Sequence, residues 1–387
     1  MHSNYIENFF TTYILHMKAS HRLFAIGLVL AGLMTTARAT AQTADEPLRY
    51  VDALQFRMIN KGFADTETPF QRLPKCLKDS ASTDLWQRQS CSSGLGIRFA
   101  TDSKRVGVRY TLLFNTHMFH MADTGLKGTD LYILDENNQW VYVNTNRPIA
   151  DENKRCDKVF VSNLDGKMHE YLIYLPLYDG VTDMEISVDS SATICSPRID
   201  NPRKAKKIVM YGTSILQGGC STRTGMVATN MIQRDLNCEV INIGISGEGK
   251  MDFCMARALA SIENVSAYII DPIPNCTLNM CDSLTYDFVN IIRKARPDVP
   301  IIMVEGPMYS YAKFDSFFAK YLPEKNAAFR KNYERLKAEN PKNLYYVTFD
   351  GISGYDNEGT VDGIHFTDIG FRRYADKIIP VLAPLLR

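Results

Sequence analysis

The pattern of hydrophobic and polar positions divides the chain into two parts of different architecture. From residue 50 to about residue 200, short apolar or alternating stretches are separated by turn residues, and no long helical period appears. Short strands at such spacing are typical of an antiparallel sandwich. We therefore predict a β-sandwich domain over residues 42–200. Its expected strands include 106–113, 131–134, 140–143, 170–177 and 184–188.

The second part alternates apolar strands with amphipathic helices. Five strands that alternate with helices indicate a parallel, doubly wound sheet. The polar, proline-rich segment 196–203 separates the two parts, so we place the second domain at residues 204–387. The expected strands are 207–211, 239–243, 267–271, 300–304 and 343–348, and the expected helices are about 224–237, 250–263, 283–296, 323–339 and 367–384.

The N-terminal segment has the pattern of a secretory leader. Basic residues follow Met17, an apolar stretch covers 23–33, and Ala-Thr-Ala precedes Gln42. This order predicts a signal peptide over residues 1–41, with Met1 or Met17 as the start, and hence a periplasmic or extracellular protein. The apolar stretch is shorter than the roughly 20 residues of a membrane-spanning helix, and no later run approaches that length.

Composition narrows the range of partners. The 387 residues are 45% hydrophobic and carry a formal net charge of +1, so the chain as a whole has no general attraction for nucleic acid or anionic membranes. The nine cysteines show no paired C-x-x-C metal spacing, and their odd number leaves at least one unpaired. An exported protein could pair some of them, but the pairing does not follow from the sequence.

Residues suited to acyl transfer follow the predicted strands. Ser214 comes directly after the strand at 207–211, at the edge where α/β sheets place their ligands. Near the C-terminus, His365 is the only histidine after position 169 and stands three residues after Asp362. A neutral imidazole takes a proton near pH 7, and a carboxylate at its other nitrogen fixes the tautomer and stabilises the imidazolium. These residues could act as nucleophile, base and orienting acid.

Two further turns should open at the same edge of the sheet. Gly247 follows the strand at 239–243, and Asn275 follows the strand at 267–271. A glycine lets its backbone N–H approach a substrate oxygen, and an asparagine offers an amide N–H from another direction. Together with the N–H of Ser214 they could form an oxyanion hole, with each donor worth about 3 kcal/mol.

The order Ser214, Gly247, Asn275 and Asp362 with His365 resembles the four blocks of the SGNH or GDSL hydrolase superfamily, over about residues 204–387. The resemblance implies a flavodoxin-like, five-stranded α/β fold without a metal or organic cofactor. It also implies that the catalytic residues are Ser214, Asp362 and His365, and that the oxyanion donors are Ser214, Gly247 and Asn275.

Two blocks depart from the superfamily pattern. Thr213 stands where the pattern G-D-S has Asp, and Ile273 and Cys276 stand where G-x-N-D has Gly and Asp. These substitutions remove no catalytic group. In the first part, Gly-Thr-Asp-Leu-Tyr at 128–132 resembles the G-x-D-L-Y signature of a β-sandwich domain that precedes such hydrolase domains in bacterial esterases.

Three residues of the first part have more than one interpretation. His117 and His120 stand three apart and could be a metal pair on a helix, but a third ligand is not evident, which favours a surface or interdomain contact. Asp130, within the G-x-D-L-Y match, is interpreted as a turn or domain-contact residue in preference to a catalyst.

These features together predict an exported serine esterase that works through a Ser-His-Asp acyl-enzyme. Export and a companion sandwich domain favour short acyl groups, above all acetyl, on carbohydrates. The expected partners are small-molecule or glycan esters, without nucleic acid or a membrane span. Two alternatives stay open: a lipase or thioesterase that acts on longer acyl chains, and a catalytically silent glycan-binding protein.

Overall fold

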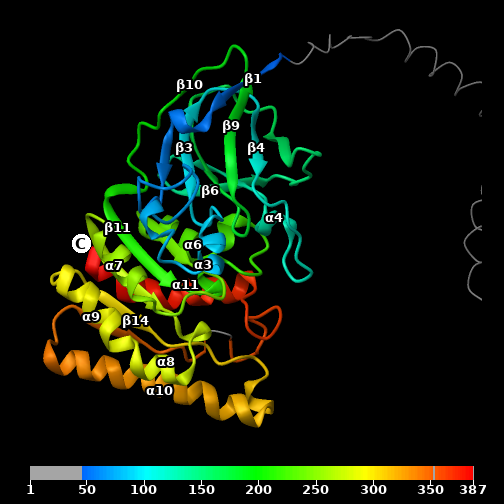
Figure 1. Cartoon of the computed structure of the whole chain (residues 1–387). Coiled ribbons are helices and arrows are strands. Elements are labelled where there is room, and N and C mark those ends of the chain that lie inside the picture. Colours follow the sequence, from blue (N-terminus) through cyan, green and yellow to red (C-terminus); the bar gives the residue numbers. More distant parts are fainter. Residues whose placement is uncertain (1–45, 352–353, 387) are drawn as a thin grey trace, which may run out of the picture. The chain divides into compact units, whose positions relative to one another are not determined.

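The computed structural model describes residues 46–351 and 354–386, so the predicted leader at 1–41 lies outside the described residues. Residues from Leu48 onward belong to one compact unit (Figure 1). Among the described residues, no helix combines the length and the apolar character needed to cross a membrane.

Two antiparallel sheets make up the first half of the chain. Alternate side chains from both sheets, such as Ile97, Phe99, Val108 and Ile186, share one buried core, as expected for a sandwich. One sheet has the order β1 (Leu48–Asp52), β9 (Val181–Asp189), β4 (Val106–Leu112), β7 (Arg155–Val161). The other has the order β10 (Ile194–Cys195), β3 (Gly96–Thr101), β8 (His169–Tyr174), β5 (Asp130–Leu134), β6 (Trp140–Thr145), with β2 (Arg57–Ile59) also paired to β3.

A five-stranded parallel sheet organises the second half, as the strand and helix pattern predicted. β11 lies between β12 and β13, so the turns that follow these three strands are neighbours at the carboxyl edge of the sheet. The order is β12 (Cys238–Gly244), β11 (Arg203–Gly212), β13 (Val265–Asp271), β14 (Ile301–Val304), β15 (Leu344–Val347). The last antiparallel strand ends at Cys195, and β11 begins at Arg203. The division into domains at residues 42–200 and 204–387 stays a prediction.

Helices cover both faces of the parallel sheet, which is why its strands are apolar on both sides (Figure 1). Successive residues of β11 show the division: Ile208 and Met210 pack into one core, and Val209 and Tyr211 pack into the other. The first core includes α6 (Ala228–Leu236) and α11 (Asp368–Leu382). The second includes α7 (Phe253–Ser261), α8 (Leu278–Ser283), α9 (Thr285–Ala295) and α10 (Ser316–Glu339).

Three expected helices have other boundaries. The helix expected at 323–339 begins at Ser316, because the carboxylate of Asp315 accepts hydrogen bonds from the N–H groups of Phe317 and Phe318, and Pro323 lies inside the helix. The helix expected at 283–296 is α9, which begins at Thr285, and Ser283 is the last residue of α8. The helix expected at 224–237 consists of a 3₁₀ turn, η4 (Thr224–Met226), followed by α6.

A buried arginine joins the first half of the chain to the parallel sheet. Arg72 is 2% exposed, and its guanidinium donates to the carbonyl oxygens of Arg88 and Cys91 in the first half. The same group donates to the carbonyl oxygens of Asn242 and Gly244, at 3.3 and 2.7 Å, at the carboxyl end of β12. Arg72 thus satisfies polar groups of both halves at once.

Candidate active site

Ser214 stands at a sharp turn from strand to helix. β11 ends at Gly212, and Ser214 begins the short helix α5 (Ser214–Gln217), whose N-cap Thr213 accepts a hydrogen bond from the N–H of Ile215. The helix ends at Gly218 with a φ of 110°, which is the left-handed conformation that glycine adopts without strain. Within the described chain, the N–H of Ser214 has no hydrogen-bond partner.

The three residues that the sequence predicts as a triad form one chain of hydrogen bonds. His365 Nε2 lies 2.8 Å from Ser214 Oγ, and His365 Nδ1 lies 2.6 Å from Asp362 Oδ2. With the ring proton on Nδ1, Asp362 accepts it and Nε2 accepts the hydroxyl proton of Ser214. This arrangement can transfer a proton from the hydroxyl to the imidazole when the oxygen attacks a carbonyl carbon.

The turn that carries Asp362 and His365 holds the carboxylate in its ionised form. Partial burial opposes ionisation, but bonds from the His365 ring and from the N–H groups of His365 and Ile364 outweigh burial and lower the pKa of Asp362. Gly363 between them has a φ of 89°, and Tyr311 packs where a side chain at position 363 would lie. The sequence therefore needs glycine at this position.

The loop of Gly247 packs on the nucleophile turn. The N–H of Ile245 donates to the carbonyl oxygen of Gly212 at 3.0 Å, and a Cβ at Gly249 would lie 2.3 Å from that oxygen. Gly247 itself is exposed, has a φ of 75°, and has an N–H without a partner among the described residues. It can therefore donate to a ligand.

Asn275 lies on the opposite side of Ser214, at the end of β13. It ends the 3₁₀ turn η5 (Ile273–Asn275), and its Oδ1 accepts a hydrogen bond from the N–H of Gly249 at 3.3 Å. This bond directs the oxygen toward the Gly247 loop and leaves the amide N–H₂ group for another acceptor. Asn275, Ser214 and Gly247 thus follow the three adjacent strands β13, β11 and β12.

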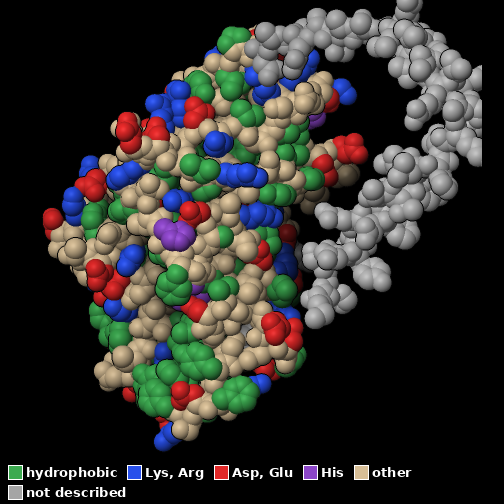
Figure 2. Space-filling view, turned by 90° about the vertical axis from the view of Figure 1, so that its right-hand side faces the viewer, with side chains coloured by type: hydrophobic (Ala, Val, Ile, Leu, Met, Phe, Trp, Pro, Cys, Tyr) green, Lys and Arg blue, Asp and Glu red, His purple; other side chains and the backbone are tan. Residues whose placement is uncertain are grey.

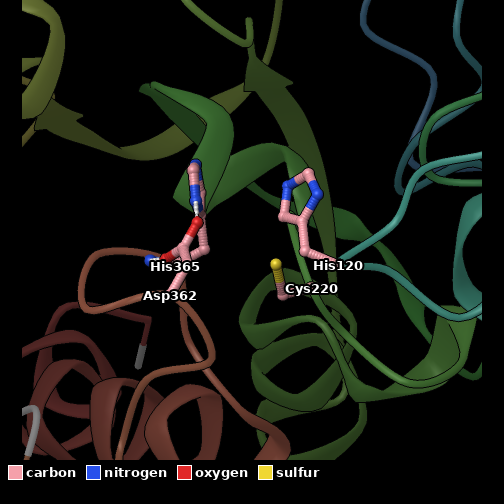
Figure 3. A group of neighbouring side chains, drawn as sticks. All are labelled: His120, Cys220, Asp362 and His365. Atoms are coloured by element: carbon pink, nitrogen blue, oxygen red, sulfur yellow. Dashed lines mark hydrogen bonds and ion pairs between the residues drawn. The ribbon is translucent and has the colours of Figure 1, made fainter.

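Three residues that the sequence did not connect with the triad reach it. Tyr178 donates through its hydroxyl to the carbonyl oxygen of Ser214 at 3.0 Å, and the ring centroid of His120 lies 6.0 Å from that of His365. Cys220, two residues after Gly218, lies in the same group of side chains (Figure 3). Burial, followed by the nearby Asp362 carboxylate, raises the pKa of Cys220 to about 12. No local pattern marks these residues, since their neighbours at the site are distant in sequence.

The structure shows what Asp130 contacts. It is fully buried in β5, and its Oδ2 accepts from Arg223 Nη1 at 2.7 Å and from the N–H of Gly225 at 2.8 Å. Tyr132 of the same motif accepts from the same guanidinium nitrogen at 2.8 Å. The G-x-D-L-Y segment therefore fastens the sandwich to the loop between α5 and α6, and Asp130 is a contact residue between the two halves.

The sequence favoured a surface or interdomain contact for His117 and His120 over a metal pair on a helix, and the structure places neither residue on a helix. Both lie in the loop between β4 and α4 (Asp123–Leu126), and His117 Nδ1 lies 2.8 Å from Asp123 Oδ1. His120 extends toward the triad instead. Figure 2 shows histidine side chains at the surface near the middle of one face, with hydrophobic side chains gathered at its lower end.

Comparison with family models gives two consecutive matches. Residues 205–383 match the GDSL-like lipase/acylhydrolase family, and residues 48–194 match GxDLY, the N-terminus of SGNH-hydrolase-type esterases. The two matches coincide with the parallel-sheet part and the sandwich part of the fold. A comparison with curated proteins gives no match.

Solved structures share the fold along most of the chain. A protein of Bacteroides ovatus described as a GDSL-like lipase is 32% identical with a TM-score of 0.82, over 88% of this chain and 98% of its own. A salicylyl-acyltransferase, SsfX3, from a tetracycline biosynthetic pathway is 15% identical with a TM-score of 0.67, over 89% and 98%. An acetyl xylan esterase (Est2A) of the rumen bacterium Butyrivibrio proteoclasticus is 12% identical with a TM-score of 0.53, over 87% and 98%. The family expected from the sequence is thereby confirmed.

Proposed function

The chain belongs to the GDSL-like lipase/acylhydrolase family, and from this premise we propose that it is a serine esterase that removes short acyl groups, above all acetyl, from carbohydrates. The observation that carries the proposal is the hydrogen-bonded chain from Ser214 Oγ through His365 to Asp362, with distances of 2.8 and 2.6 Å. Such a chain is the minimum needed to make a serine hydroxyl nucleophilic near neutral pH.

The proposed reaction has two steps. Ser214 Oγ attacks the ester carbonyl while His365 Nε2 takes its proton, and the charge on the resulting imidazolium is stabilised by Asp362. The imidazolium then protonates the departing alcohol, which leaves an acyl-serine. In the second step His365 removes a proton from water, the hydroxide oxygen attacks the acyl carbon, and the free acid and Ser214 are restored.

The negative oxygen of each tetrahedral intermediate needs donors at the edge of the sheet. We assign this role to the N–H groups of Ser214 and Gly247, which have no other partner among the described residues, and to the amide of Asn275. Donors already fixed in place stabilise developing charge without reorganisation, at about 3 kcal/mol each.

Two features support a small acyl group on a carbohydrate. Ser214 is 8% exposed, so little of its surface reaches solvent, and we take this as favouring a small acyl group. Exposed rings lie on both sides of the triad residues. Phe119 is 96% exposed beside the ring of His120. Phe317 is 60% exposed and packs on Phe318, whose ring contacts Tyr311. Flat apolar faces of this kind can stack on sugar rings. The acetyl xylan esterase that shares the fold also guides this choice.

The exposed rings equally suit a longer acyl chain, so a lipase is the second candidate. The first experiment measures hydrolysis of a short activated ester by wild type and Ser214→Ala. The matched control is Ser261→Ala, which changes an exposed serine at the end of α7. Ser214→Ala should lose at least about 10³-fold in kcat/KM, and Ser261→Ala should lose nothing. Equal turnover by a folded Ser214→Ala would reject the nucleophile.

The second experiment separates the substrates. Wild type is expected to release acetate from an acetylated polysaccharide faster than it cleaves a long-chain ester. Cleavage of long-chain esters alone would favour the lipase, and binding of the glycan without any hydrolysis would favour a silent binding protein. Export of the chain is a further part of the proposal. N-terminal sequencing of the protein recovered from fractionated cells would test for removal of residues 1–41.

A further inference from the structure

Four potential metal ligands from three distant segments meet beside the nucleophile. His120 comes from the loop after β4, Cys220 follows α5, and Asp362 and His365 come from the turn before α11. One ligand atom from each lies within 4.8 Å of the others. Figure 3 shows the sulfur of Cys220 pointing into the space between His120 on one side and Asp362 with His365 on the other. The sequence showed no further metal ligands to accompany His120. In the structure the hydrolase part supplies them, as Cys220, Asp362 and His365.

Two of these side chains have no partner that explains their position. Cys220 is 4% exposed and is a free thiol, and no other described residue makes a hydrogen bond to its sulfur. Its backbone has a φ of 72°, a conformation that a residue with a side chain rarely adopts. The Nδ1 atom of His120 is buried and has no hydrogen-bond partner among the described residues. Buried polar atoms without partners are uncommon and often mark a ligand site.

The loop that carries His120 is fastened before any ligand binds. The carboxylate of Asp179, which is fully buried, accepts hydrogen bonds from the N–H groups of Phe114, Asn115 and Thr116, at 2.9, 2.7 and 3.4 Å. A carboxylate that accepts several backbone N–H groups holds the chain in one conformation. The chain is thereby fixed up to four residues before His120, which lowers the entropic cost of binding.

We propose that His120, Cys220, Asp362 and His365 bind one divalent cation of borderline softness, represented by Zn²⁺, and that its binding switches the active site off. One thiolate, two imidazoles and a carboxylate are the ligand types that zinc prefers. The thiol proton of Cys220 leaves to solvent when the sulfur coordinates the metal.

Inhibition follows from the positions of the two nitrogens of His365, and this part of the inference rests on the proposed function. Nε2 faces Ser214 and Nδ1 faces Asp362, so whichever nitrogen coordinates the metal is lost to proton transfer. Zinc holds its ligands at about 2.0 to 2.3 Å, which places them roughly 3.5 Å from one another. The side chains must therefore rearrange around the ion, and the 2.6 Å contact between His365 and Asp362 must lengthen if His365 coordinates through Nδ1.

The first test measures binding without catalysis. Ser214→Ala, freed of metal by chelation and kept reduced, is titrated with Co²⁺, whose thiolate complex absorbs by charge transfer. We expect one equivalent of Co²⁺ to bind, and the charge-transfer band to appear as it binds. The band should vanish in Ser214→Ala/Cys220→Ser and remain in the matched control Ser214→Ala/Cys254→Ser, where Cys254 is a half-buried thiol of α7. Absence of the band, or its persistence without Cys220, would overturn the site. This result does not depend on whether the protein is an esterase.

The second test measures inhibition. Zn²⁺ should abolish ester hydrolysis by wild type, and a chelator should restore it. Removal of one ligand should raise the inhibitory concentration at least about tenfold in Cys220→Ser and in His120→Gln, with each variant compared with its own metal-free activity. The two variants change different segments, so misfolding of one, detected by circular dichroism, leaves the other informative. Equal inhibition of wild type and both variants would refute the proposal.

Discussion

The buried contact between Asp130 and Arg223 should be one of the costliest single contacts to remove. Asp130 is fully buried, and one of its oxygens accepts two hydrogen bonds, from Arg223 at 2.7 Å and from the N–H of Gly225 at 2.8 Å. Burial raises the pKa of this carboxyl, and the bonds from Arg223 and Gly225 oppose that effect. We expect Asp130→Ala to leave a partly buried guanidinium and a buried N–H without their acceptor.

The size of the loss can be worked from these contacts. Hydrogen bonds to charged groups contribute about 1.5 to 3 kcal/mol each, and removal of one partner of a buried pair costs about 3 to 5 kcal/mol. Arg223 is 21% exposed and keeps its bond to Tyr132 and its position 3.8 Å from the ring centroid of Tyr142. These remaining contacts favour the lower end, so Asp130→Ala should lower the free energy of unfolding by about 3 kcal/mol.

Urea unfolding followed by circular dichroism and by fluorescence measures this loss, provided that both signals give the same transition. Asp183→Ala is the matched control, because Asp183 is exposed on β9 and its change should stay within about 0.5 kcal/mol. Adding Arg223→Met to Asp130→Ala should cost little more, since it removes the orphaned charge. A loss below about 1 kcal/mol for Asp130→Ala would refute the reasoning.

Three other changes test the site and its supports. The pKa of Asp362 is lower in the folded protein than the value of about 3.9 in the unfolded chain. The ionised carboxylate should therefore stabilise the fold above a pH of about 3.9, and this stabilisation should be lost as the pH falls through the folded pKa. The unfolding free energies of wild type and Asp362→Asn, from urea titrations, should differ at neutral pH and converge in acid; a constant difference would contradict this. Gly225→Ala should lower Tm more than Gly247→Ala. A Cβ at position 225 would lie 2.2 Å from Tyr132 Oη, whereas a Cβ at position 247 meets no atom and adds only the strain of a φ of 75°; the reverse order would contradict this. Asn275→Ala should lower kcat about 10²- to 10³-fold with little change in KM, and unchanged steady-state turnover would remove it from the oxyanion hole.

Local patterns predicted the fold because each strand and helix carries its own periodicity. The five parallel strands appear where apolar runs stand in the sequence, and their ends place Ser214, Gly247 and Asn275 on adjacent turns. Boundaries were less predictable. The capping bonds from Asp315 start α10 at Ser316, seven residues before the predicted helix range begins.

The surroundings of the triad could not be predicted in the same way. His120 and Tyr178 come from the sandwich part and reach His365 and Ser214 only after the two halves pack together. The sequence allowed an interdomain contact for His120, but nothing in the spacing of these residues indicates that His365 or Ser214 is the partner. Cys220 stands close to Ser214 in sequence, but its role depends on a backbone with a positive φ that cysteine rarely adopts.

The position of Arg72 bears on how this chain can be engineered. A fragment that starts at β11 would lack the guanidinium that binds the carbonyl groups of Asn242 and Gly244. Those carbonyls precede the Gly247 loop, so the loss would fall next to the chemistry itself. Transplanting the catalytic half onto a different partner would therefore require a surrogate cation at the same depth.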